Sequence, residues 1–195
     1  MTETIIDLIR HGEPIGGSKY RGHNIDDPLS EKGWSQMRNA TTGVPPWDHI
    51  VTSPMIRCHD FAQELSNTHN ISVSVEHDFR EVGFGVWEGK TREQLKTERL
   101  KEYEGFYHDP VNCRPEGAEE LDFFIQRVTQ AYQKHIKQHA GKHILIVAHA
   151  GVIRAIIAQA LNAAPIGLYR IKISNAGISR LSHDQHGDHL IYHDK

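Results

Sequence analysis

The feature that most constrains this chain is a short apolar run at residues 144–148, Ile-Leu-Ile-Val-Ala, which contains no polar side chain. Both faces of such a strand are apolar, which is typical of a strand in a parallel sheet covered by helices on both faces. Residues 152–161 are predicted to form a helix after it. Residues 118–138 are predicted to form the longest helix before it, because apolar side chains recur there at steps of three and four. These side chains are Leu121, Phe124, Ile125, Val128, Tyr132 and Ile136.

Shorter apolar segments elsewhere predict the rest of a sheet. Strands are expected at residues 5–9, 49–52 and 71–75. The tail at residues 168–191 alternates apolar and polar residues around Gly177 and Gly187, which favours short antiparallel strands. Strands that alternate with helices predict an α/β fold, a three-layer α/β/α sandwich with a mostly parallel central sheet.

Capping residues indicate where three further helices begin. Ser30 is followed by charged residues and is a predicted N-cap. Ser53 is followed by Pro54, which suits a cap with proline in the first helical turn. A polar helical segment is expected from about Thr91, after a glycine-rich stretch at residues 83–89.

Length and composition narrow the class of protein. The 195 residues are enough for one substantial core, so we expect a single domain over residues 1–195. Only two cysteines, Cys58 and Cys113, are present, which fits a reducing compartment and a cytoplasmic protein. No apolar stretch approaches the roughly 18 residues of a membrane span. The net charge is −3 with both signs interspersed, so neither nucleic acid nor a membrane is an expected partner.

Chemistry-bearing residues follow the predicted strands. Arg10 and His11 end the first strand, Arg57 lies shortly after the second, and His149 follows the run at residues 144–148. Ligands of open parallel sheets bind beyond the carboxyl ends of the strands, so these residues are expected to converge. Guanidinium groups bind two phosphate oxygens at once, and a neutral imidazole is a competent nucleophile for phosphoryl transfer. The helix after His149, opening at Ala150, could add backbone N–H groups to an anion site.

Four segments in order resemble the histidine phosphatase superfamily, the phosphoglycerate-mutase-like proteins. They are Leu-Ile-Arg-His-Gly-Glu at residues 8–13, Ser-Pro-Met-Ile-Arg-Cys at 53–58, the stretch from Phe79 to Gly89, and His-Ala-Gly-Val-Ile-Arg at 149–154. Pro-Glu-Gly at 115–117 also resembles the family's entry to its corresponding helix. The resemblance spans about residues 5–155 and implies a phosphoglycerate-mutase-like fold and a phosphatase.

The resemblance also implies the role of each site residue. His11 would be the phosphorylated nucleophile, and Arg10, Arg57 and His149 would bind the transferring phosphoryl group. Glu81 would donate a proton to the leaving oxygen and then act as base for the attacking water. Glu13 and Glu88 are alternatives for the acid role, although the Trp-Glu-Gly context of Glu88 more often constrains a turn. We expect no metal and no other cofactor.

One position departs from the family pattern. Many relatives carry asparagine six residues after the nucleophile, where this chain has Gly17. The glycine-rich loop at residues 14–18 could offer backbone N–H groups to phosphate instead, with Ser18 and Asn24 as further alternatives. Ser18, Arg21 and Ala150 are our predicted substrate-binding residues beyond the core set. The departure weakens the case for mutase-type substrate handling.

The segments at residues 16–22, 26–30 and 32–37 resemble the α-ribazole phosphatase branch, which removes a 5′-phosphate during assembly of the cobalamin nucleotide loop. The alternatives are a phosphatase of another small phosphorylated metabolite, a phosphoglycerate mutase-type enzyme and, remotely, a non-catalytic binding protein of the same fold. Mutases are usually longer between Gly89 and Pro115, which favours hydrolysis. A monomer and a homodimer are both open.

Other hydrolase classes fit the sequence poorly. A cysteine phosphatase needs arginine six residues after its cysteine, but those positions hold Glu64 and Glu119. A Gly-x4-Gly-Lys-Ser/Thr phosphate loop is absent from the sequence. His135 and His139 share a helix face without the glutamate of the zinc-protease pattern. The histidine-rich tail is predicted to be a solvated hairpin rather than a metal site; its residues are His183, Asp184, His186, Asp188, His189 and His193.

Overall fold

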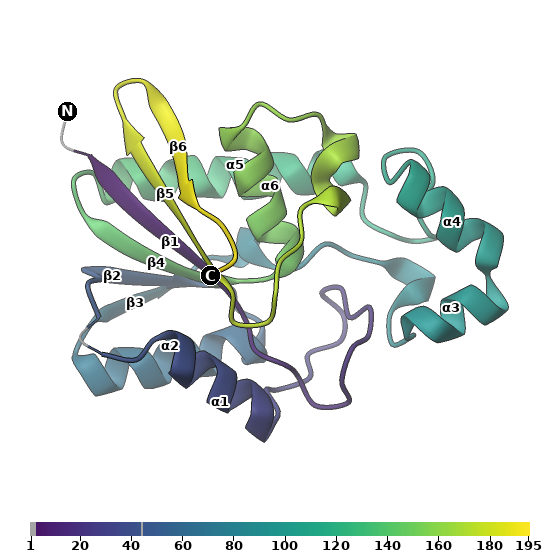
Figure 1. Cartoon of the computed structure of the whole chain (residues 1–195), viewed down its shortest axis with the longest axis horizontal. Helices are drawn as coiled ribbons and strands as arrows, with labels where there is room; N and C mark the ends of the chain where they lie inside the picture. The colour runs from purple at the N-terminus through teal and green to yellow at the C-terminus, as the bar shows by residue number, and fades with distance from the viewer. Residues whose placement is uncertain (1–2, 44) are drawn as a thin grey trace.

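The computed structural model describes residues 3–43 and 45–195, in which strands and helices alternate along most of the chain (Figure 1). The strands are β1 (Thr4–Arg10), β2 (His49–Thr52), β3 (Ser72–Val75), β4 (His143–Ala148), β5 (Ile178–Asp184) and β6 (Gly187–Tyr192). The helices are α1 (Glu31–Ala40), α2 (Ile56–His69), α3 (Arg92–Glu98), α4 (Leu100–His108), α5 (Leu121–Gln138) and α6 (Ala150–Ala160). Three short 3₁₀ turns are η1 (His77–Phe79), η2 (Gly85–Trp87) and η3 (Pro165–Arg170).

The described strands form one six-stranded sheet in the order β3-β2-β4-β1-β5-β6. The first four strands of that order run parallel, and β5 and β6 are antiparallel additions at the β1 side. Helices α1 and α2 cover one face of the sheet, and α5 and α6 cover the other (Figure 1). The predicted α/β/α sandwich with a mostly parallel sheet is therefore confirmed.

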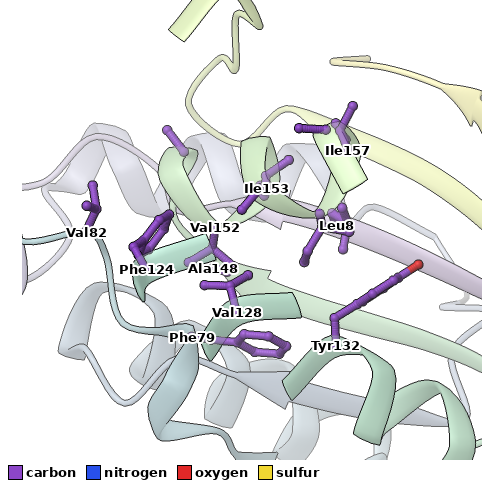
Figure 2. Packing of buried hydrophobic residues seen from close by; sticks show 14 of the residues in the cluster. Leu8, Phe79, Val82, Phe124, Val128, Tyr132, Ala148, Val152, Ile153 and Ile157 are labelled. Atoms are coloured by element: carbon purple, nitrogen blue, oxygen red, sulfur yellow. The ribbon is translucent and has the colours of Figure 1, made fainter. Parts of the chain in front are cut away.

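Strand β4 shows why its sequence has no polar residue. Alternate side chains of a strand point to opposite faces. Ile144 and Ile146 pack in the core under α5 and α6, whereas Leu145 and Val147 pack in the core under α2. Figure 2 shows the first of these cores, where residues of β1 and β4 meet apolar side chains of α5 and α6. Both faces of β4 are buried, so a polar side chain on either face would lower the stability of the folded protein.

The ends of several elements differ from the sequence prediction. Helix α2 begins at Ile56 and its N-cap is Met55, so the expected cap at Ser53-Pro54 is wrong. The Ser53 hydroxyl is hydrogen-bonded to His149 Nε2 at 2.7 Å instead, which is a contact 96 positions away in sequence. The caps expected at Ser30 and Thr91 are confirmed, since each side chain accepts a hydrogen bond from the first turn of its helix.

Two helices and the tail have shifted boundaries. Helix α5 begins at Leu121, three residues later than expected, because Glu119 is held by Arg127 Nε at 2.7 Å and by the Gly83 N–H at 3.1 Å. Helix α6 begins two residues early, at Ala150. The antiparallel strands of the tail are confirmed from residue 178 on, but the tail's first residues, 168–170, lie in the turn η3 rather than in a strand. None of the helices within the described residues has the length and apolarity to cross a membrane.

Candidate active site

The carboxyl end of β1 places Arg10 and His11 at the edge of the sheet. The His11 N–H donates to the Ala148 carbonyl at 3.0 Å, which continues the parallel pairing of β1 with β4 by one residue. The next residue must be glycine, because a Cβ at Gly12 would collide with the backbone of Gly33 in α1. The site is therefore built on the two central strands of the sheet.

The His11 ring is held in a form suited to nucleophilic attack. Its Nδ1 lies 2.8 Å from the Gly12 carbonyl oxygen, which can only accept, so Nδ1 carries the proton and donates. Nε2 then keeps its lone pair. Burial holds the pKa of His11 well below its ordinary value, and the charges of Arg10 and Arg57 lower it further. The imidazole is neutral at physiological pH.

Arg57 is a buried cation and Arg10 a half-buried one, and backbone carbonyls fix both in place. Arg10 Nη1 donates to the Ile173 carbonyl at 2.7 Å. Arg57 donates through Nη1 to Ile25 at 3.0 Å and through Nη2 to Gly22 at 3.2 Å. Burial lowers the pKa of Arg10 to about 10, which still leaves it charged at neutral pH.

The Nε atoms of these two arginines have no hydrogen-bond partner among the described residues. An unpaired buried donor costs stability, and an unpaired donor on a cation costs more. Arg10 and Arg57 line the same cavity as His11. A phosphate oxygen is an acceptor of the charge and geometry that guanidinium donors favour.

His149 ends β4 and is the N-cap residue of α6. Its ring centroid lies 5.2 Å from that of His11, in an edge-on arrangement. The side chain is fully buried, and it is not among the residues that line the cavity. Burial lowers the pKa of His149 well below its ordinary value, and the charges of Arg57 and His11 lower it further. The structure thus brings His149 to the site but places it one layer below the surface.

Glu81 enters the cavity from the segment after η1. Its Oε2 accepts from the Gly151 N–H of α6 at 3.2 Å, and its Oε1 accepts from the Val82 N–H at 2.9 Å. A Cβ at Gly151 would collide with the Glu81 carboxylate, so glycine permits this approach. One carboxylate oxygen is therefore fixed by the same helix start that follows His149.

The two competing carboxylates lie elsewhere. Glu13 pairs with Lys32 Nζ at 3.0 Å, and Glu88 accepts from the Phe84 N–H at 2.9 Å. Neither lines the cavity. The backbone contact of Glu88 agrees with the turn-constraining role that its sequence context favours.

The loop between β1 and α1 contributes only part of what was predicted. Ser18 and Arg21 line the cavity, and Ala150 does so from α6. Arg21 is also held by Asp27, at 2.9 Å from its Nε. Gly17 and Asn24 do not line it, and the Gly17 N–H donates back to Pro14 at 3.2 Å. The Gly17 N–H is therefore already bonded, and phosphate binding by other N–H groups of residues 14–18 stays a prediction.

The cavity has a volume of about 550 Å³, which suits a small organic ligand. Several of its residues were missed in the sequence. They are Lys19, Tyr20, Gly22, Phe84, Arg92, Tyr107, Arg154, Tyr169, Lys172, Ile173 and Ser174. Arg154 ends a motif that was recognised, and Lys19, Tyr20 and Gly22 lie in a recognised loop. Lys172 and Ser174 carry no local signal, because the fold brings them to Arg10 from far along the chain.

The histidine-rich tail forms the β5–β6 hairpin. Its histidines contact nearby acceptors: His183 lies 2.8 Å from Asp188 and His189 lies 3.3 Å from Asp184. Within residues 3–43 and 45–195 no three His, Cys, Asp or Glu side chains are grouped so that they could hold a metal ion. A metal-free reaction stays a prediction that needs experiment.

The chain is similar to known proteins in sequence and in fold. The model of the family described as "Histidine phosphatase superfamily (branch 1)" matches residues 6–194. A bifunctional protein of Mycobacterium tuberculosis is 30% identical over 182 residues, which cover 91% of this chain and 50% of that protein. The chain thus spans about half the length of this relative.

Two further comparisons cover most of both chains. The adenosylcobalamin/alpha-ribazole phosphatase of Salmonella typhimurium is 26% identical over 170 residues, 85% of this chain and 84% of that protein. The solved structure of YhfR from Bacillus stearothermophilus aligns with a TM-score of 0.87 at 24% identity, covering 96% of this chain and 95% of that one. The structural likeness shows a shared fold.

Proposed function

The chain belongs to the histidine phosphatase superfamily, and we propose that it hydrolyses small phosphate monoesters through a phosphohistidine formed on His11. The family and the phosphatase class predicted from the sequence are confirmed by the family match and by relatives named as phosphatases. The roles of individual residues are proposals.

One observation carries the proposal: a neutral histidine with a free Nε2 lies beside two arginines whose buried Nε donors have no partner among the described residues. Phosphoryl transfer needs a nucleophile in line with the leaving oxygen and positive charge on the equatorial oxygens. His11 would supply the first, and Arg10 and Arg57 the second. His149, 5.2 Å from His11 between ring centroids, does not line the cavity and would act through its contact with His11.

The reaction then has two halves. His11 Nε2 attacks phosphorus, the bond to the ester oxygen breaks, and Glu81 donates a proton to that oxygen. The alcohol leaves, and the deprotonated Glu81 removes a proton from water as the water attacks phosphorus. The bond between phosphorus and Nε2 breaks, and inorganic phosphate is released. The Gly151 N–H, 3.2 Å from Oε2, orients the carboxylate for both proton transfers.

Two substrate proposals follow from different observations. α-Ribazole 5′-phosphate is supported by the loop at residues 16–22 and by the relatives in Salmonella typhimurium and Escherichia coli named adenosylcobalamin/alpha-ribazole phosphatase. A phosphate ester whose leaving group carries its own negative charge is supported by the cationic wall of the cavity. We further propose one domain over residues 1–195 and a cytoplasmic enzyme, in keeping with its free cysteines Cys58 and Cys113.

The test measures phosphate release from a panel that includes α-ribazole 5′-phosphate, 3-phosphoglycerate and p-nitrophenyl phosphate. Reactions with ³²P-labelled substrate, quenched in base, should trap label that is stable to base and lost in acid, as expected of phosphohistidine. Release of phosphate without trapped label in single-turnover reactions would contradict the proposed intermediate. Interconversion of 2- and 3-phosphoglycerate without phosphate release would make the enzyme a mutase.

A further inference from the structure

The wall of the cavity carries far more positive than negative charge. Its cations are Arg10, Lys19, Arg21, Arg57, Arg92, Arg154 and Lys172. Among the lining residues that the structure describes, Glu81 is the one carboxylate. Two guanidinium groups match one phosphate dianion, so Arg10 and Arg57 suffice for the transferring group. The other cations exceed what a phosphate monoester with a neutral leaving group requires.

One of the additional cations already has a carboxylate partner. Arg21 pairs with Asp27, and the neighbouring tyrosines Tyr103 and Tyr107 raise the pKa of Arg92, which has no carboxylate within 4.0 Å among the described residues. Three others, Lys19, Arg154 and Lys172, also have no carboxylate within 4.0 Å in the part of the chain that the structure describes. We call these three residues the outer cations.

The outer cations come from two parts of the chain. Arg154 projects from α6, where its Nε donates to the Ile171 carbonyl at 2.8 Å and its guanidinium lies 5.4 Å from the centre of the Tyr169 ring. Lys172 follows Ile171 directly, so these two charges share one wall. Lys19 belongs to the loop between β1 and α1 and approaches from another part of the chain.

One of the outer cations, Arg154, also acts on the phosphate site. After burial and Glu81, the charge of Arg154 is the next largest influence on the pKa of Arg10. Like charges on one cavity wall raise its positive potential, and a bound anion relieves their repulsion. An exposed lysine by itself needs no partner, but here two lysines and a half-buried arginine face the space that a leaving group would occupy.

We propose that Lys19, Arg154 and Lys172 form a subsite for a second anionic group, a carboxylate or a further phosphate, on the leaving group of the substrate. The inference rests on the proposed phosphatase function and narrows its substrate class. The ribazole part of α-ribazole 5′-phosphate is uncharged, so that ester makes no use of the subsite. Substrates with a second anion are therefore favoured over it.

The test compares substrates that differ in this second charge. The carboxylate arm pairs 3-phosphoglycerate with sn-glycerol 3-phosphate, which has the same carbon skeleton but no carboxylate. The phosphate arm pairs ribose 1,5-bisphosphate with ribose 5-phosphate. In at least one arm, kcat/KM should favour the substrate with two anions by on the order of 10-fold, and added salt should reduce the preference. The arm that shows it identifies the second group.

A double variant, Lys19→Gln with Lys172→Gln, tests which residues cause the preference. Each exposed ion pair contributes up to about a 5-fold effect, so the double variant should lose most of the preference. Lys137→Gln, at an exposed lysine of α5 away from the cavity, is the matched control and should keep it. A preference that survives in the double variant would overturn the assignment to the outer cations.

The proposed function and the subsite can fail separately. Equal kcat/KM within both substrate pairs overturns the subsite and leaves the phosphatase intact. If the wild-type protein releases phosphate from no substrate, the proposed function is wrong, and calorimetric binding decides the subsite. Tighter binding of 3-phosphoglycerate than of glycerol 3-phosphate, or of the bisphosphate than of ribose 5-phosphate, then supports it. Equal binding in both pairs overturns it.

Discussion

Buried and half-buried histidines gather at both ends of the sheet, and only one of these two groups has the surroundings of a reactive site. His11 and His149 lie at the carboxyl ends of β1 and β4. At the opposite end His49 opens β2, and its ring stacks on that of His139 with 4.4 Å between the centroids. The rings of His135 and His139 are nearly parallel at 5.9 Å.

The pKa is lowered in every histidine of both groups, and burial is the largest cause in each case. Their neighbours differ. His135 Nε2 lies 3.0 Å from Glu76, His49 Nε2 lies 2.8 Å from Ser74, and this group does not line the cavity. The active-site pair has Arg10 and Arg57 beside it and open space in front of His11. A neutral buried imidazole is therefore not enough to mark a nucleophile; the adjoining cations and cavity make the difference.

Replacing His11 should give the largest effect. His11→Ala removes the proposed nucleophile, so the rate of phosphate release should fall by about 10⁴-fold or more, with no trapped phosphoenzyme. Initial rates and quenched ³²P labelling check this. His139→Ala is the matched change in the other histidine group and should retain activity. Appreciable turnover by His11→Ala would show that the mechanism is wrong.

Glu81→Gln should have the next largest effect, and its size should depend on the leaving group. General acid help is worth about 10²–10⁴-fold for a poor alkoxide leaving group, whereas p-nitrophenolate needs little help. Single-turnover phosphorylation should therefore slow much more with an alkyl phosphate than with p-nitrophenyl phosphate. Steady-state rates mix both steps, so phosphorylation is followed by rapid quench.

One outcome of that experiment would reassign Glu81. Equal slowing with both substrates would make it a phosphate-positioning or structural residue. Glu13 or Glu88 would then be the better acid, although neither lines the cavity. Glu88→Gln serves as the control carboxylate change.

The second histidine group should show itself in stability rather than in activity. Burial lowers the pKa of His139 to about 4, with help from the charges of His49, His135 and Lys142. His139 binds a proton near pH 6.5 in the unfolded chain but only near pH 4 in the folded chain. Stability is therefore lost as the pH falls from 6.5 towards 4, and protonation of His139 contributes to that loss.

Denaturant unfolding at pH 7 and pH 5 measures that loss. His139→Gln removes the titrating ring, so its free energy of unfolding should change less between the two pH values than that of the wild type. An equal pH dependence in both proteins would mean that His139 does not titrate as the geometry implies. The comparison of slopes stands even if the substitution lowers stability at both pH values.

Chelation should have the smallest effect. The proposed site neutralises phosphate with guanidinium groups, which a chelator cannot remove. Activity should be unchanged after prolonged treatment with EDTA and dialysis, measured with p-nitrophenyl phosphate. Loss of activity that a divalent ion restores would point instead to the histidine-rich hairpin of β5 and β6.

Local patterns explain what could be predicted from the sequence. Strand β4 was recognisable because both of its faces are apolar, and α1 because Ser30 caps it. Arg10, His11 and His149 could be placed together because parallel strands share a carboxyl edge. Glu81 was named through the family resemblance, since no local pattern brings it to Gly151.

Long-range contacts explain what was missed. Ser53 has the composition of a helix cap, but its hydroxyl is used by His149, 96 positions later. Lys172 lies at the cavity because of the path that the chain takes from η3 to β5, and no sequence motif predicts that path. The same holds for the link between Arg10 and Ile173. Contacts of this kind leave no periodic trace in sequence.

The bond from Arg10 to the Ile173 carbonyl joins positions 163 residues apart, and β1 pairs with β4 and β5, which come late in the chain. During synthesis the first strand therefore leaves the ribosome well before its partners exist. At about 5–20 residues per second, the interval is on the order of ten seconds or more. An apolar strand left unpaired for that time is prone to aggregation. Slower translation should therefore increase misfolding of the nascent chain.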